Sequence, residues 1–466
     1  MSKLLRGRNR AKIGSVDDFE NQEDWLNNGE WIKPDEWLDI SNVANNEIHI
    51  LATDGYVGFS CTLSSSGTYS IDWGDGTVET LRASTIVYHH QYNATNGGYM
   101  PNLDMWQYKI RIYDVSTTIT KFLINSSTPN IYNSGQVQYN SILWFYTKIN
   151  TFTDLSSAFI RCVLLQSVTI PYCASCSTML NLFNNCKQLV SYKSPILWNN
   201  TISNINSMFS GCKMIHTIKL PMTLGSSIND AASFLNGCSS LKNINNTTFI
   251  NGIASIAGIF QNSDVFSKII TVNNTSATQS NNMFAGTSIT KAIITNWGNA
   301  NINKSFMFNN CTMLKEVTLP INKSNGVSNT ISTIFAVCVN LTTINNISSL
   351  GHNAVDTNAD SAFTNAFSLT GILTIDFRLS KFSCEGINST YKMKITGLRL
   401  THPSSGFGGT SPQINCSYCD FSAAALNTLF GDLPTLTGKT INITGCTGAA
   451  TCDRTIATAK GWTVTG

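Results

Sequence analysis

Charged residues are scarce in this chain of 466 residues: Asp, Glu, Lys and Arg make up only 12%, against about 25% in average globular domains. The net charge of +3 is too small over this length for bulk attraction to nucleic acid. No run of about 18 apolar residues could span a membrane. The segment that follows Met1 lacks the apolar stretch of a secretory signal. We therefore expect neither a nucleic-acid nor a membrane partner, and a chain that matures in a cytosol.

Residues for catalysis are also few. The chain has six histidines, and His216 falls at an outward strand position, where a lone histidine is usually a surface residue. There is no G-x-S-x-G, no phosphate-binding glycine loop and no H-E-x-x-H. The central region also has few acids for the paired carboxylates of a glycosidase. The sequence therefore predicts no enzyme, no catalytic residue and no cofactor.

The central part of the chain repeats one pattern. In segment 208–221, M-F-S-G-C-K-M-I-H-T-I-K-L-P, a Phe is followed by Cys at three, apolar residues at six, nine and eleven, and Pro at twelve. Full copies also start at Phe159 and Phe308. Degraded copies start at Phe183, Phe234, Phe260, Phe284, Phe335 and Phe363, and the Phe234 copy has one extra residue before Cys238. The intervals of 24 to 28 residues are typical of a leucine-rich-repeat solenoid.

Such a repeat buries its apolar side only by stacking on its neighbours. Side chains alternate along a strand, so positions six, nine and eleven are expected to point inward, and eight and ten outward. The Phe and Cys lie one helical or 3₁₀ turn apart and can face the same core. Proline ends the strand because it has no N–H for the ladder.

The pattern M-F-x-x-C-x-x-L-x-x-I-x-L-P resembles the BspA-like subgroup of leucine-rich repeats over residues 151–377. Members of that subgroup occur on bacterial surfaces and in proteins of phages that infect gut anaerobes, as binding or adhesion modules. The resemblance implies a solenoid over 151–377 that binds a protein or a glycan.

The fourteen cysteines allow two interpretations, free core thiols or a metal site. The pairs Cys173/Cys176 and Cys416/Cys419 lie at opposite ends of the array and cannot share a metal. A zinc site from Cys416, Cys419, Cys446 and Cys452 is conceivable, but its last spacing is poor for zinc. Disulfides are not expected without a secretory signal. We therefore predict free thiols and no metal, because six cysteines hold one buried repeat position: Cys162, Cys186, Cys212, Cys238, Cys311 and Cys338.

Residues 47–126 consist of short apolar runs between polar turns, which predicts strands at 48–52, 57–63, 69–73, 110–113 and 120–124. The run Trp73-Gly74-Asp75-Gly76 suits a tight turn. It resembles the W-G-D-G marker of the polycystic-kidney-disease (PKD) type Ig-like domain, and 90–92 (H-Q-Y) and, loosely, 108–112 fit two further markers. The resemblance implies an Ig-like β-sandwich over 47–126, in which Asp72 and Asp75 shape a turn rather than bind metal or catalyse.

The remaining segments connect or cap these parts. Residues 127–150 form a linker, whose apolar run 142–146 is expected to cover the open first face of the solenoid. After Phe377 the repeat phase is lost. Residues 378–466 are predicted to be a C-terminal repeat or cap with a helix over 420–433, N-capped by Asp420 or Ser422. A strand over 439–444, a short helix over 453–460 and a final strand over 461–464 follow.

The predicted fold class is therefore mainly β: an Ig-like (PKD) β-sandwich followed by a leucine-rich-repeat solenoid with short helical or 3₁₀ segments. Its outward strand face supplies the candidate binding residues, a polar surface with scattered lysines that suits a glycan or a protein. Such a surface is equally what any solvated sheet requires. The candidates are Lys193, Thr217, Lys219, Lys268, Glu316 and Thr318.

Residues 1–46 combine a basic block, an acidic block and three tryptophans, too little to close a core. Because tryptophan is a strong anchor at interfaces, one interpretation is an arm that docks on a larger assembly. In that case chains that lack 1–46 should fold but fail to join it. The other interpretation is that residues 1–46 form a tail packed loosely on the chain's own next domain. The candidate docking residues are Arg6, Arg8, Arg10, Trp25, Trp31 and Trp37.

Three classes of function fit these features: a structural virion protein of a bacteriophage, a bacterial cell-surface adhesin of the BspA-like type, and a cytosolic scaffold. The missing secretory signal favours the first, because phage proteins assemble inside the host. Glu36-Trp37-Leu38, shortly before a W-G-D-G domain, also resembles tail and appendage proteins of large gut and marine phages, including crAss-like ones. This resemblance implies a tail, fibre or appendage component, assembled in the host cytoplasm and located in the virion. Expected partners are other virion proteins (tail, ring or hub), further copies of the chain in a homo-oligomer, and a host-surface glycan or protein.

Overall fold

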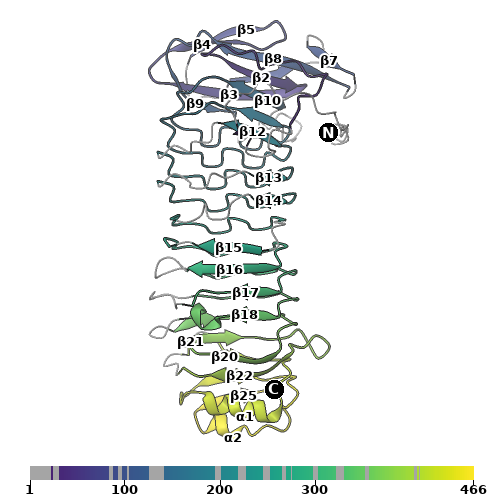
Figure 1. Cartoon of the computed structure of the whole chain (residues 1–466), viewed down its shortest axis with the longest axis vertical. Helices are drawn as coiled ribbons and strands as arrows, with labels where there is room; N and C mark the ends of the chain where they lie inside the picture. Colours follow the sequence, from purple (N-terminus) through teal and green to yellow (C-terminus); the bar gives the residue numbers. More distant parts are fainter. Residues whose placement is uncertain are drawn as a thin grey trace. The chain divides into compact units, whose positions relative to one another are not determined.

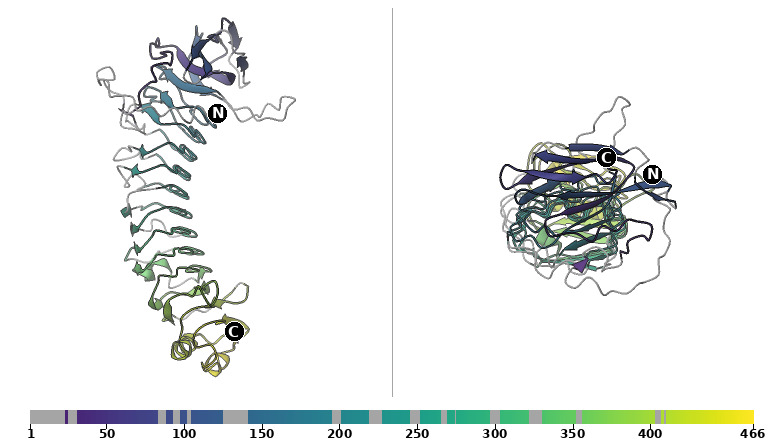
Figure 2. Two further views of the ribbon diagram at one scale, coloured as in Figure 1. Left: turned by 90° about the vertical axis from the view of Figure 1, so that its right-hand side faces the viewer. Right: turned by 90° about the horizontal axis from the view of Figure 1, so that it is seen from above.

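The computed structural model describes residues 23–24, 31–82, 88–92, 97–101, 104–124, 141–194, 201–218, 227–244, 252–264, 269–273, 275–296, 303–321, 330–351, 356–402, 407–408 and 410–466. The described part of the chain is mainly β, with 32% strand and 5% helix, and contains a β-solenoid of about 11 turns (Figure 1). It divides into two compact units, Met1–Ile228 with Phe234–Asn246, and Asn229–Ser233 with Thr247–Gly466. Within each unit, successive turns stack on one another (Figure 2).

The first unit is built on a nine-stranded sheet in the order β1-β12-β11-β10-β2-β8-β4-β5, with β7 paired to β8. Its strands are β1 (Glu23–Asp24), β2 (Ile48–Thr53), β4 (Thr68–Asp72), β5 (Val78–Arg82), β7 (Gly98–Met100), β8 (Met105–Tyr113), β10 (Ile142–Thr147), β11 (Ser167–Thr169) and β12 (Ser191–Ser194). A three-stranded sheet contains β6 (Tyr88–Tyr92), β3 (Gly55–Leu63) and β9 (Ile119–Leu123), and a two-stranded one β13 (Thr217–Ile218) and β14 (Asn243–Ile244). The five strands expected over 48–124 thus form as β2, β3, β4, β8 and β9.

The W-G-D-G segment is a hydrogen-bonded turn. Gly74 N–H donates to Asp72 Oδ1 at 2.9 Å and Thr77 N–H to Asp75 Oδ1 at 2.9 Å. Asp75 Oδ2 lies 2.8 Å from His90 Nε2, and the His90 ring stacks on the buried Trp73. Burial alone would raise the pKa of Asp75, but hydrogen bonds from Thr77 and His90 outweigh it and lower that pKa. Both aspartates therefore act here as turn residues.

Strand β10 joins the N-terminal strands to the solenoid turns of the first unit. Phe145 pairs with Ile50 of β2 in antiparallel register and with Val168 of β11 in parallel register. Its ring lies 4.8 Å from that of Phe159, the first phenylalanine of the repeat. The apolar run at 142–146 thus adds the strand that precedes the first repeat, as a cap must.

The second unit contains only parallel strand pairs among its described residues. One sheet has the order β15 (Ile269–Asn273), β16 (Lys291–Asn296), β17 (Glu316–Thr318) and β18 (Thr343–Asn345). Another has β19 (Thr357–Ala359), β21 (Leu379–Ser383), β23 (Ile414–Asn415), β24 (Lys439–Asn442) and β25 (Trp462–Thr465). A third pairs β20 (Gly371–Ile375) with β22 (Ile395–Leu400). The helices among the described residues are the 3₁₀ helix η2 (Ile347–Leu350), α1 (Ala423–Asp432) and α2 (Thr455–Thr458).

Each repeat crosses its Phe–Cys segment in a series of turns rather than in a helix. Phe159 N–H donates to Leu182 O of the next turn at 2.9 Å, whereas Ala158 N–H donates to Leu155 O of its own turn at 3.2 Å. Two residues per repeat adopt the left-handed conformation, with φ between 55° and 75°. We call the position of the repeat phenylalanine the Phe place and the position three residues later the Cys place. The two left-handed residues lie two residues before and two residues after the Phe place. They are Ser157 and Arg161, Asn181 and Asn185, Ser207 and Gly211, Ser233 and Gly237, Gly258 and Asn262, Asn282 and Gly286, Phe306 and Asn310, Thr333 and Val337, and Ser361 and Asn365.

The phenylalanines of successive repeats stack face to face. The rings of Phe159 and Phe183 are 5.4 Å apart at 14°, and those of Phe308 and Phe335 are 5.5 Å apart at 7°. The expectation of an extra residue before the cysteine of the Phe234 copy is wrong. Phe209 N–H bonds to Phe234 O, so Leu235 holds the Phe place and Phe234 holds the preceding one.

The cysteines of the repeat bond to the turn before them. The thiols of Cys186, Cys212 and Cys238 donate to the carbonyls of Phe159, Phe183 and Phe209 at 2.9, 3.1 and 3.2 Å. In the second unit, the thiols of Cys311 and Cys338 donate to Phe284 O and Phe308 O, both at 2.9 Å. Thirteen of the fourteen cysteines are buried, and all are free thiols. Their fixed position thus reflects a specific hydrogen bond as well as packing.

The repeat continues beyond Phe377, contrary to the expectation that its phase is lost there. Phe363 N–H bonds to Ser383 O, Cys384 N–H to Asn415 O and Cys416 N–H to Asn442 O. Cys384, Cys416 and Ile443 therefore occupy the Phe place of three further turns. The phase was missed because none of these three residues is a phenylalanine.

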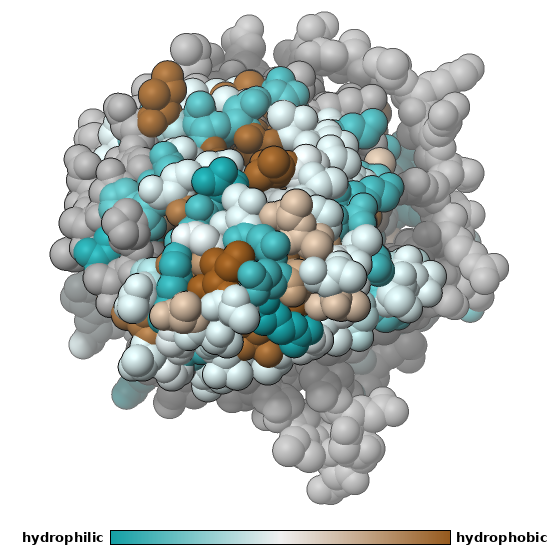
Figure 3. Space-filling model, turned by 90° about the horizontal axis from the view of Figure 1, so that it is seen from below, coloured by the Kyte–Doolittle hydropathy of each residue, from teal (hydrophilic) through white to brown (hydrophobic). Residues whose placement is uncertain are grey.

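The C-terminal end forms the predicted elements over slightly shorter ranges. Ser422 caps α1, its side chain accepting from Ala425 N–H, and Trp462 of β25 is buried. The surface at this end is a mixture of hydrophilic residues with scattered hydrophobic ones (Figure 3). A partly polar outer face is typical of the capping turn of a solenoid.

Candidate binding face and docking segment

The outward face of the first turns is covered. Ser167, Thr169 and Ser191 are 1%, 2% and 0% exposed, and the predicted binding residue Lys193 is 8% exposed. The backbone of Lys193 pairs with Asp24 of β1, which lies antiparallel along β12. The expectation that Lys193 offers its side chain at an open outward face is therefore wrong: this part of the sheet is covered.

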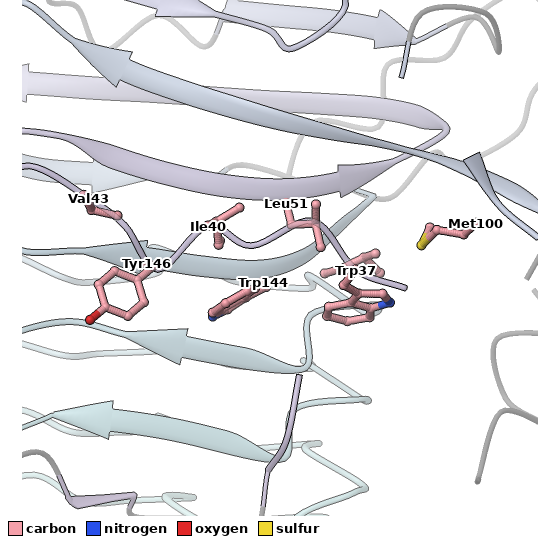
Figure 4. Packing of buried hydrophobic residues seen from close by; sticks show 8 residues of the cluster. Trp37, Ile40, Val43, Leu51, Met100, Trp144 and Tyr146 are labelled. Atoms are coloured by element: carbon pink, nitrogen blue, oxygen red, sulfur yellow. The ribbon is translucent and has the colours of Figure 1, made fainter. Parts of the chain in front are cut away.

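Part of this cover is a hydrophobic cluster on the outer side of β10 (Figure 4). Trp144 and Tyr146 project from β10, opposite Phe145, which faces the solenoid core. Trp37, Ile40 and Val43 pack against them. The cluster is completed by Leu51, Met100 and Leu143 and flanked by Trp31, Met105 and Leu164.

Two of the predicted docking residues thus belong to the chain's own packing. Trp37 is 4% exposed, and the ring of the half-buried Trp31 lies 5.4 Å from that of Trp144. Trp37 is therefore not offered to a partner, and residues 31–46 follow the alternative of packing on the next domain. A chain that lacks 1–46 would lose part of a core and is not expected to fold normally. Arg6, Arg8, Arg10 and Trp25 lie outside the described residues.

The other predicted binding residues are distributed over both units. Thr217 is half-buried on β13 in the first unit. Lys219 and Lys268 lie outside the described residues, and the residue in register with Lys291 of β16 is Ile269, not Lys268. Glu316 and Thr318 lie on β17, and the structure brings these two together.

Glu316 and Thr318 form part of a polar network on the outward side of β16–β18. Lys291 Nζ lies 2.9 Å from Glu316 Oε1. Asn345 Nδ2 donates to Glu316 Oε1 at 3.3 Å and to Thr318 Oγ1 at 3.1 Å. We refer to the outward residues of this sheet as the β15–β18 face: Thr271, Lys291, Ile293, Glu316, Thr318, Thr343 and Asn345.

The β15–β18 face is fixed from behind and open in front. Ile270, Ala292 and Val317 project inward from the same strands and are fully buried. On the outward side Thr271, Thr343 and Asn345 are exposed, and Lys291 and Glu316 are each about one-third exposed. The donors and acceptors of this face therefore have fixed positions and remain accessible to a partner.

Sequence reasoning missed Lys291 and Asn345. The repeat that starts at Phe284 has one residue between Thr287 and Ile289 where the full pattern has two, so its outward positions are seven and nine. The Phe260 copy has one residue more than the full pattern, so its buried strand residues Ile270 and Val272 lie ten and twelve residues after Phe260 instead of nine and eleven. Aligning the apolar pairs Ile270/Val272 and Ala292/Ile294, instead of counting from the phenylalanine, would have identified Thr271, Lys291 and Ile293.

The described residues contain no group of three His, Cys, Asp or Glu side chains arranged to hold a metal ion. The pair Cys416/Cys419 reproduces the Phe and Cys places of the repeat, because Cys419 Sγ donates to Cys384 O at 3.1 Å. Within the part of the chain that the structure describes, no helix is both long and apolar enough to cross a membrane.

Comparison with known proteins returned no relatives. No protein-family model matches the chain, and neither a curated protein nor a solved structure does.

Proposed function

We propose that this chain is a non-enzymatic structural protein that binds a protein or glycan ligand through the β15–β18 face. The observation that carries the proposal is the network of Lys291, Glu316, Thr318 and Asn345. It combines a cation, a carboxylate, a hydroxyl and an amide on four rigid positions of one sheet. Hydrogen-bonding groups held in this way favour affinity because little side-chain freedom is lost on binding.

We further propose that the protein is a bacteriophage virion component, associated with the tail or forming a fibre or appendage. Support comes from the sequence resemblances to BspA-like repeats over 151–377, to a PKD-type Ig-like domain over 47–126 and, at Glu36–Leu38, to phage appendage proteins. The β-solenoid is compatible with such a display role. The alternative is a bacterial cell-surface adhesin, which would use the same face.

The binding proposal is tested with the full chain, fluorescently labelled, on a glycan array and on a panel of intact gut bacteria. The variant Lys291→Glu places two acids side by side on the face and should reduce any specific binding at least tenfold. Lys187→Glu, the same charge change at an exposed turn of the first unit, is the matched control and should bind like the parent. Equal loss of binding in both variants, or unchanged binding in both, would contradict the assignment of the face.

The virion proposal has a separate test. Peptides of this chain should co-purify with phage particles through a density gradient at a constant ratio to capsid peptides. Recovery in the bacterial surface fraction of uninfected cells would instead support the adhesin.

A further inference from the structure

Cys384 contacts two other thiols inside the second unit. Its Sγ lies 3.8 Å from Sγ of Cys416 and 3.8 Å from Sγ of Cys419. All three side chains are fully buried. The cluster arises because two cysteines hold the Phe place in successive turns, beside a third in the Cys place.

The backbone positions of Cys384 and Cys416 suit a disulfide. They follow the paired residues Ser383 and Asn415 of two adjacent parallel strands, β21 and β23. In-register neighbours on such strands have Cα atoms about 4.8 Å apart, within the range of about 4.4–6.8 Å that disulfides accept. A bond between them requires the sulfur atoms to approach from 3.8 Å to about 2.05 Å.

The other repeat cysteines are arranged differently. The thiols of Cys186 and Cys212, also on successive turns, are each directed at a phenylalanine carbonyl. Cys419 likewise donates to Cys384 O. Cys384, in contrast, directs its thiol at the sulfur of Cys416.

We propose that Cys384 and Cys416 form a reversible disulfide that links two turns of the second unit. With oxidised glutathione as oxidant, the thiolate of one cysteine attacks a glutathione sulfur, the glutathione S–S bond breaks, and one glutathione thiolate leaves. The second cysteine then attacks the mixed disulfide and releases the other glutathione. The two cysteines lose two electrons, one oxidised glutathione gains them, and the two protons pass to the released thiolates.

Burial decides when this reaction can occur. It raises the pKa of the Cys384 thiol well above its ordinary value, and contact with Cys384 and burial do the same for Cys416. Because the thiolate is the attacking species, the folded protein should react slowly, and the bond should form while the chain folds or while these turns open. This inference does not depend on the binding face.

The test uses the full chain, unfolded under reduction and refolded in an oxidising or a reducing glutathione buffer. Free thiols are then blocked with N-ethylmaleimide, and peptides are mapped by mass spectrometry without reduction. The oxidised sample should contain a Cys384–Cys416 peptide pair and unfold at a higher denaturant concentration, and dithiothreitol should reverse both effects. Cys186 and Cys212 should remain blocked as free thiols.

Two variants make the assignment specific. Cys416→Ser should abolish the linked peptides and the shift in unfolding midpoint, whereas Cys419→Ser should keep both. Complete blocking of Cys384 in the oxidised parent, or its linkage to Cys419, would overturn the proposal. Both outcomes are read in the parent chain, so the test does not depend on how well a variant folds.

Discussion

The thiol of Cys212 donates a hydrogen bond to the carbonyl oxygen of Phe183, 3.1 Å away in the preceding turn. The same oxygen already accepts the N–H of Cys186 at 2.9 Å, so the thiol occupies its second lone pair. Because that oxygen keeps the Cys186 N–H, losing the thiol costs about 0.5–1.5 kcal/mol, the net contribution of one hydrogen bond. We expect Cys212→Ala to lower the free energy of unfolding by about 2 kcal/mol, the lost packing included. Cys212→Ser keeps a donor and should lose less, as measured by urea unfolding. Equal losses would mean that the sulfur acts only by filling space.

Val337 adopts a left-handed conformation with φ of 61°, which is costly for a β-branched residue. The same place in other repeats is held by Asn185, Asn262, Asn310 and Asn365, and asparagine tolerates this conformation. We expect Val337→Asn to stabilise the protein by about 1 kcal/mol, seen as a higher thermal unfolding midpoint. Asn310→Val, with φ of 58° at the matched position, is the control and should destabilise it.

Lys304 is fully buried at a place where other turns have Ile205 and Ile331. Burial lowers the pKa of its ammonium group to about 7, whereas a lysine of the unfolded chain titrates at about 10.4. Between these values the unfolded state holds a proton that the native state lacks, so stability should rise with pH across that window.

Lys304→Met should therefore be more stable than the parent at pH 7, by several kcal/mol at roughly 1.4 kcal/mol per pKa unit. The difference should shrink as the pH is raised towards 10. Unfolding curves of both proteins at several pH values test this, and a difference that does not depend on pH would show that Lys304 is charged in the native state.

Trp37 distinguishes a core role from a docking role of the N-terminal segment. Because its side chain packs against Ile40 and Trp144, we expect Trp37→Ala to cost about 3–5 kcal/mol of stability. The neighbouring Leu38 is 38% exposed, so Leu38→Ala is the control and should cost far less.

A chain that lacks residues 1–22 keeps this cluster and is the suitable truncation for the docking question. We expect its free energy of unfolding to stay within about 0.5 kcal/mol of that of the full chain, and any oligomer that the full chain forms in mass photometry to be lost. The same oligomeric state for both chains would remove the role of Arg6, Arg8 and Arg10 in self-assembly.

Prediction from the sequence succeeded where one residue type recurs at a fixed place. The spacing of Phe209, Cys212, Ile215 and Ile218 shows which side chains enter the core, because a repeat that cannot bury its own apolar side must stack. It failed at Lys291, where the spacing changed by one residue, because such a slip exchanges the two faces of a strand. It also failed at Cys384 and Cys416, where a smaller residue takes the Phe place.

Stacking follows from the sequence alone, since the repeat length and the alternation of apolar residues leave one way to bury the apolar side chains. The turn at Asp72 and Asp75 also follows from it, because that turn depends on residues close in the chain. The burial of Trp37 and the covering of Lys193, in contrast, depend on how distant segments pack. The same tryptophan can anchor a partner or fill a core, and the choice depends on whether Trp144 and Tyr146, more than a hundred residues away, need cover on their outer side.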